Sequence, residues 1–103
     1  MLDVQVRHEP KATIVVVPGD LLASSVPDVR TCLRELVKAG KTHLVVDLHH
    51  TQMIDSTGLG LLLSAYNSVS AVQGSFAVRG VSDDLLDLFR SLRISQHFPV
   101  SGR

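Results

Sequence analysis

Short runs of β-branched apolar residues alternate along this chain with longer stretches in which apolar residues recur every three or four positions. The runs are Ile14-Val15-Val16-Val17, His43-Leu44-Val45-Val46-Asp47-Leu48 and Ser75-Phe76-Ala77-Val78-Arg79. Each predicts a strand, and the second predicts a strand at the centre of the sheet that is covered on both faces. Because strands separated by helices pair in parallel through right-handed crossovers, the pattern restricts the fold to the α/β class.

Three apolar stripes at helical spacing follow these strands. Their members are Val26, Val29, Leu33, Leu36 and Val37; Leu59, Leu62, Leu63, Tyr66 and Val69; and Leu85, Leu88, Phe89 and Leu92. Ser24 or Ser25 is the expected N-cap of the first helix, with Pro27 in its first turn. Gly40 and Gly74 are expected to end the first and second helices.

The third helix has charges that suit its dipole. Ser82 is the expected N-cap, Asp83 and Asp84 follow in the first turn, and Arg90 and Arg93 stand in the expected last turn. Carboxylates near the N-terminus and cations near the C-terminus of a helix are stabilising. The pattern therefore predicts a helix that extends at least to Arg93.

Two further strands are expected at the ends of the chain. Val4 and Val6 alternate with polar residues before Glu9-Pro10-Lys11, which predicts an edge strand, and His97-Phe98-Pro99-Val100 predicts a last short strand. We therefore expect residues 1–103 to form one α/β domain. The domain has three helices and a mixed, mainly parallel sheet of four to five strands, the first of which is antiparallel.

Composition excludes several classes of function. The 103 residues contain ten Lys plus Arg and ten Asp plus Glu with no basic run, which argues against a nucleic-acid partner. One cysteine, Cys32, cannot form an internal disulfide. No apolar run is long enough to insert in a membrane, and Met1-Leu2-Asp3-Val4-Gln5 does not resemble a secretory signal, so the expected compartment is the cytoplasm.

The histidines do not form a metal motif. His8, His43, His97 and the pair His49-His50 are scattered, without His-x-x-x-His or Cys-x-x-Cys spacing. Adjacent side chains on an extended segment point to opposite faces, so the pair is poorly placed to chelate one ion. We expect no metal site and no cofactor.

The segment Asp55-Ser56-Thr57-Gly58-Leu59-Gly60 superficially resembles three catalytic signatures. A nucleophile elbow needs Gly where Ile54 stands, an aspartic-protease loop needs Gly at Thr57, and a dinucleotide fingerprint needs Gly at Leu63. No general base lies at a recognisable spacing from Ser56. The segment predicts a strand-to-helix turn with a hydroxyl or carboxylate N-cap, and not an enzyme active site.

The same segment carries a family resemblance. Residues 54–63, Ile-Asp-Ser-Thr-Gly-Leu-Gly-Leu-Leu-Leu, follow Val45-Val46-Asp47-Leu48 and are similar to the signature of STAS domains, in particular bacterial anti-sigma-factor antagonists. Gly19-Asp20-Leu21, Gly74 before the Phe76–Val78 strand, and Val81-Ser82 before the third helix stand in the family's order. The resemblance covers nearly the whole chain.

The resemblance implies a partner-switching protein without catalysis of its own. It places phosphorylation on Ser56, with Thr57 as the rival acceptor or a cap or packing residue, and gives Asp55 the role of orienting the loop. The implied partners are an anti-sigma factor with serine kinase activity, bound in the unphosphorylated state, and a serine phosphatase. The implied partner-binding residues are Asp20, Met53, Ile54, Asp55, Ser56, Thr57, Gly58, Leu59 and Gly60.

A second function fits the same resemblance. The chain is alternatively an accessory subunit of a membrane transporter, for example an ABC-type lipid transporter, which binds its ATPase without phosphorylation. One departure bears on the choice, because Leu22 stands where many antagonists have Asp beside the phosphorylation loop.

Overall fold

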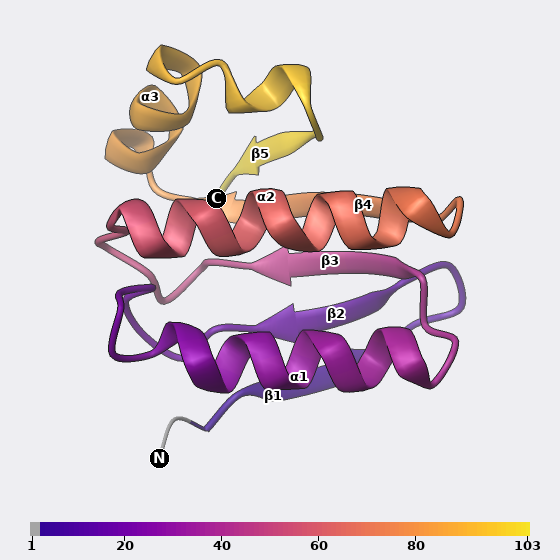
Figure 1. Cartoon of the computed structure of the whole chain (residues 1–103). Coiled ribbons are helices and arrows are strands. Elements are labelled where there is room, and N and C mark those ends of the chain that lie inside the picture. Colours follow the sequence, from indigo (N-terminus) through magenta and orange to yellow (C-terminus); the bar gives the residue numbers. More distant parts are fainter. Residues whose placement is uncertain (1–2) are drawn as a thin grey trace.

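A computed structural model describes residues 3–103 as one five-stranded sheet with three α-helices (Figure 1). The strands are β1 (Gln5–His8), β2 (Thr13–Val16), β3 (His43–Asp47), β4 (Ser75–Val81) and β5 (Val100–Gly102), and they lie side by side in that order. β1 pairs antiparallel with β2, and all other pairs are parallel. The predicted α/β fold, with β3 at its centre, is confirmed.

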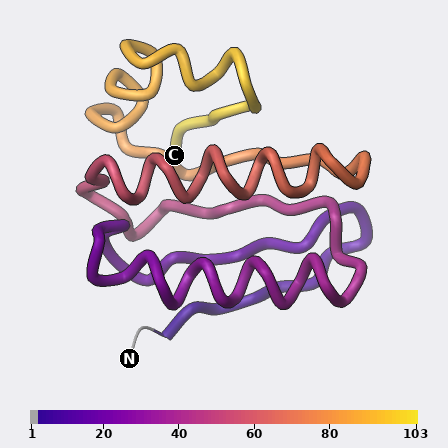
Figure 2. Tube along the Cα trace, in the orientation of Figure 1, coloured from indigo at the N-terminus to yellow at the C-terminus, as the bar shows by residue number. Residues whose placement is uncertain are grey.

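The helices are α1 (Val26–Lys38), α2 (Ser56–Ala71) and α3 (Asp83–Ser91), followed by a 3₁₀ turn, η1 (Ile94–Gln96). Both α1 and α2 lie over the same face of the sheet, and α3 with η1 lies beyond β4 (Figure 1). The Cα trace runs from β1 at one edge of the sheet to β5 at the other (Figure 2).

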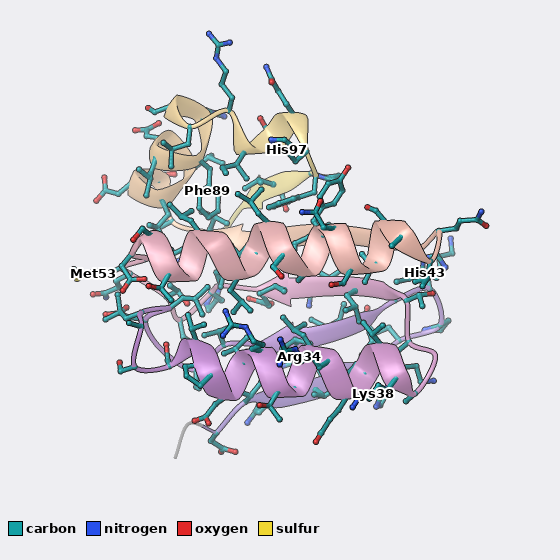
Figure 3. All side chains as sticks on the ribbon, in the orientation of Figure 1. Arg34, Lys38, His43, Met53, Phe89 and His97 are labelled. Atoms are coloured by element: carbon teal, nitrogen blue, oxygen red, sulfur yellow. The ribbon has the colours of Figure 1, made fainter. Side chains whose placement is uncertain are left out.

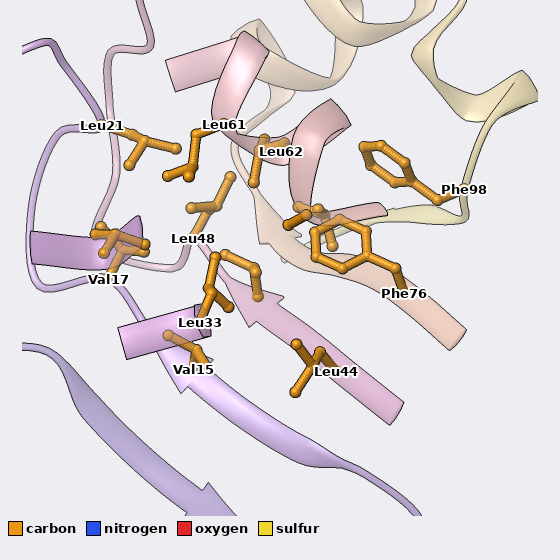
Figure 4. Close-up of a cluster of buried hydrophobic side chains, with 14 of the residues drawn as sticks. Val15, Val17, Leu21, Leu33, Leu44, Leu48, Leu61, Leu62, Phe76 and Phe98 are labelled. Carbon is orange, nitrogen blue, oxygen red and sulfur yellow. The ribbon is translucent and has the colours of Figure 1, made fainter. Parts of the chain in front are cut away.

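The main core lies between the sheet and the layer formed by α1 and α2 (Figure 4). Leu44, Val46 and Leu48 are almost completely buried against this layer. The alternate residues Val45 and Asp47 are only half-buried. The expectation that this strand is covered on both faces is therefore wrong, because the crossovers before and after β3 place α1 and α2 on the same side of the sheet.

The structure corrects the predicted cap of α1. Ser25 occupies the N-cap position, but its side chain does not cap the helix. Its hydroxyl donates to the Asp20 carbonyl at 2.8 Å and accepts from the Leu22 amide at 3.0 Å. By contrast, Ser82 caps α3 as predicted, with its side chain accepting from the Leu85 amide at 3.3 Å.

Only one of the two glycines that were expected to end a helix does so. Gly40 has φ +84° and its amide donates to the Val37 carbonyl, so it ends α1 as expected. After α2 the left-handed residue is Gln73, with φ +61°. Gly74 instead passes so close to the Thr42 carbonyl that any Cβ would overlap it.

The third helix is shorter than predicted. α3 ends at Ser91, Arg93 lies outside it with φ +55°, and Leu92 is 48% exposed, so neither has its expected place in the last turn or on the inner face. Ile94 and Phe98 are buried instead. Because the chain forms η1 before it rejoins the sheet, the last strand begins at Val100 and not at His97.

The described residues include no helix with both the length and the apolar character needed to span a bilayer. The prediction that the N-terminus lacks a secretory signal rests partly on Met1 and Leu2, which lie outside the described residues.

Candidate functional site

Two loops meet at the edge of the sheet where β2 and β3 end. One loop precedes α1 and the other precedes α2, and Leu21 forms a parallel bridge with Ile54 between them. The Leu21 amide donates to the Met53 carbonyl at 3.0 Å, and the Asp55 amide donates to the Leu21 carbonyl at 3.3 Å. Loops at the carboxyl ends of parallel strands are the usual place for binding sites in this fold class.

Side chains of both loops reinforce this bridge. Asp20 Oδ1 accepts from the amides of Gln52 at 2.9 Å and Met53 at 3.1 Å. The buried Thr51 hydroxyl donates to the Gly19 carbonyl at 2.6 Å. Because each of these bonds joins residues about 32 positions apart, the two loops form one platform.

Asp55 holds the platform and the helix together. It is the N-cap of α2, where Oδ1 accepts from the Gly58 amide at 2.9 Å, and Oδ2 accepts from the Ala23 amide at 2.9 Å. The amide of Gly58, followed by that of Ala23, lowers the pKa of the Asp55 carboxyl. The carboxylate alternative for the predicted N-cap is therefore the correct one.

Gly58 permits the close approach of α2 to the first loop. It is buried, and a Cβ at this position would overlap the Leu21 carbonyl oxygen and lie 2.9 Å from Ile54 Cγ2. Gly60, in the same helix, is exposed and has open space where a Cβ would stand. The two glycines of the motif thus differ in role.

Ser56 and Thr57 are both exposed, in the first turn of α2. No hydrogen bond of the Ser56 hydroxyl is found within residues 3–103, and the cap is supplied by Asp55. Thr57 is neither the cap nor a packed residue, so that expectation for it is wrong. The turn presents two exposed hydroxyl-bearing side chains beside the Asp55 carboxylate, both of whose oxygens already accept hydrogen bonds.

An apolar margin surrounds these hydroxyls. Met53 is 60% exposed, while Ile54 and Leu59 are half-buried. The first turn of α2 contains no acidic or basic residue. We call Asp20 together with residues 53–60 the Ser56 surface.

Two buried polar residues hold the platform in ways that no sequence motif indicated. Thr51 and Ser25 donate to carbonyl groups of the first loop, although Ser25 was expected only as an N-cap. Asp47, at the end of β3, takes no part in the platform bonds described above, and its Oδ2 accepts from Arg79 Nε at 3.1 Å. Within residues 3–103 no three His, Cys, Asp or Glu side chains gather as a metal site would require.

Comparison with known proteins matches residues 3–102 to the family model described as STAS domain. An anti-sigma-B factor antagonist of Listeria monocytogenes is 34% identical over 89 residues, which are 85% of this chain and 77% of that protein. An anti-sigma factor antagonist from Mycobacterium paratuberculosis has the same fold, with a TM-score of 0.86 at 19% identity over 100% of this chain and 87% of the other. The phosphorylated form of the Bacillus cell fate determinant SpoIIAA gives 0.75 at 17% identity, over 98% and 92%.

Proposed function

Because this chain belongs to the STAS domain family, we propose that it is an anti-sigma factor antagonist whose binding is controlled at Ser56. In the unphosphorylated state the Ser56 surface binds an anti-sigma factor that is also a serine kinase. Phosphorylation of Ser56 releases that partner, and a separate serine phosphatase restores binding. The name of the Listeria relative supports the antagonist class.

One observation carries this proposal: Ser56 is exposed and its hydroxyl makes no hydrogen bond within the described residues, while its neighbour Asp55 caps the helix. A kinase can therefore reach the oxygen without opening the fold. The absence of a hydrogen-bonded base also argues against Ser56 as a catalytic nucleophile.

Phosphorylation would add a large negative charge to a helical turn that contains no charged residue. Phosphate adds about −1.5 to −2 charges at neutral pH. The N-terminal end of α2 tolerates an anion, and the associated stabilisation is about 0.3–1 kcal/mol. A partner that covers exposed Met53 and the neutral hydroxyls must instead desolvate a dianion. A penalty of about 3 kcal/mol weakens association about 100-fold.

Phosphorylation assays test the acceptor. Each anti-sigma factor kinase encoded in the source genome is incubated with the chain and labelled ATP, and the modified residue is located by mass spectrometry. We expect label in the wild type, in Thr57→Ala and in the exposed loop control Ser24→Ala, and none in Ser56→Ala. Label that persists in Ser56→Ala would refute the assignment.

Binding assays separate this proposal from the transporter alternative. Ser56→Asp should bind the kinase at least tenfold more weakly than the wild type, with a melting temperature within a few degrees. Association with a transporter ATPase that is unaffected by Ser56→Asp, with no phosphorylation by any kinase, would establish the alternative.

A further inference from the structure

A concave feature lies on the helical layer, between α1 and α2. It has a volume of about 320 Å³ and extends between the helices down to Leu44 of β3. Its remaining apolar lining comes from Leu33 and Val37 of α1 and from Leu61 and Ala65 of α2. We call this feature the α1–α2 groove. None of its lining residues belongs to the Ser56 surface.

One rim of the groove is cationic. Arg30, Arg34 and Lys38 all line it, and their i, i+4, i+8 spacing places them on one face of α1. Figure 3 labels Arg34 and Lys38 on this helix. No carboxylate is among the lining residues, although the chain has equal numbers of acidic and basic residues. Within residues 3–103 no salt bridge engages these three cations.

The other rim is small and uncharged. α2 contributes Ser64 and Ser68, both exposed, beside the small buried Ala65. Short side chains here leave the space that larger residues would fill. The groove therefore combines an apolar floor, a row of positive charges on one side and hydroxyl groups on the other.

We propose that the α1–α2 groove binds a free single-chain anionic amphiphile, with its carboxylate on the Arg34 side and its alkyl chain on the apolar floor. The volume lies at the lower end of the range for small-molecule sites, about 300–1,000 Å³. An acidic helix, about 10–12 Å across with its side chains, would lie over the two helices without filling the slot. Guanidinium groups bind carboxylates through paired hydrogen bonds, so charge and shape select the same ligand.

Titration with fatty acids tests the proposal, followed by amide and methyl NMR shifts and by calorimetry below the micelle concentration. Decanoate should shift the signals of Leu33, Leu61 and Ala65 and bind at least tenfold more tightly than decanol or decyltrimethylammonium. From octanoate to decanoate the affinity should rise roughly 4-fold for each buried methylene. Equal affinity for decanol and decanoate, or no shift at these residues, would overturn the proposal.

Variants locate the site. Arg34→Gln should weaken decanoate binding about tenfold, and Ser64→Phe, which places a ring over the groove, should abolish it. The matched control Arg90→Gln changes an exposed arginine on α3 and should bind as the wild type does. Thermal unfolding verifies that each variant is folded.

Two results would refute the site assignment. The first is an equal loss of binding in Arg34→Gln and Arg90→Gln, since that would indicate a general charge effect. The second is binding to phosphatidylglycerol vesicles without binding of monomeric decanoate, since that would make a lipid surface, and not a free acid, the partner.

Discussion

Replacing Gly58 by Ala tests the packing that brings the two loops of the Ser56 surface together. A new Cβ there would overlap the Leu21 carbonyl oxygen, a backbone atom that moves only if the loop moves. Overpacking of this kind costs about 3 kcal/mol at the upper end of its usual range. Alanine regains about 1 kcal/mol of helix propensity over glycine. We therefore expect Gly58→Ala to lower the free energy of unfolding by about 2 kcal/mol.

Gly60→Ala is the matched control, because it makes the same chemical change in the same helix where a Cβ meets open space. This variant should gain the propensity term alone, about 1 kcal/mol. For a domain of this size the melting temperature should fall by roughly 8–16 °C in Gly58→Ala and rise by roughly 4–8 °C in Gly60→Ala. Urea unfolding followed by circular dichroism measures the two changes in the free energy of unfolding, and thermal unfolding measures the two changes in melting temperature. A Gly58→Ala variant as stable as Gly60→Ala would refute the reasoning.

Two further predictions concern titratable groups. The amide of Gly58, and then that of Ala23, lowers the pKa of Asp55, so its carboxylate stabilises the fold above the unfolded pKa of about 3.9 and loses this effect as pH falls through the folded pKa. The stability gap between wild type and Asp55→Asn, measured by urea unfolding, should shrink from pH 7 to pH 3, and a gap that does not change with pH would contradict this. Burial, with a smaller effect from Glu35, raises the pKa of Cys32, so iodoacetamide should alkylate it more slowly at pH 8 than an unstructured peptide thiol. Equal rates would show that the thiol is not shielded.

The order of strands and helices was predictable because each element carries its own periodicity. β3 has apolar residues on the face that packs under α1 and α2, and Ser82 sits directly before the stripe of α3 that it caps. Where the prediction of the α1 cap failed, a competing contact within the preceding loop decided the outcome. Ser25 has the sequence of an N-cap, but its hydroxyl bonds to the Asp20 carbonyl instead.

The candidate site was predictable as a continuous segment of sequence, but the residues that this segment contacts were not. The motif around Ser56 marked the turn before α2, and the carboxylate cap was one of the expected alternatives. The partners of Asp55 and Thr51 on the first loop lie 32 residues away in the sequence, at Ala23 and Gly19. Local patterns carry no information about such pairs, since only the folded sheet brings the two loops together.

The order of Asp55 and Ser56 explains how a modification here would act on a partner and leave the fold in place. Ser and Asp are comparable N-caps, and phosphorylation of a capping serine would alter the very oxygen that accepts the helix hydrogen bond. Here Asp55 supplies the cap, and the Ser56 side chain contributes no hydrogen bond within the described residues. Phosphate on Ser56 would therefore remove no interaction from the domain. Its repulsion by Asp55 is opposed by the positive end of α2, so the largest change in free energy falls on whatever protein covers the turn.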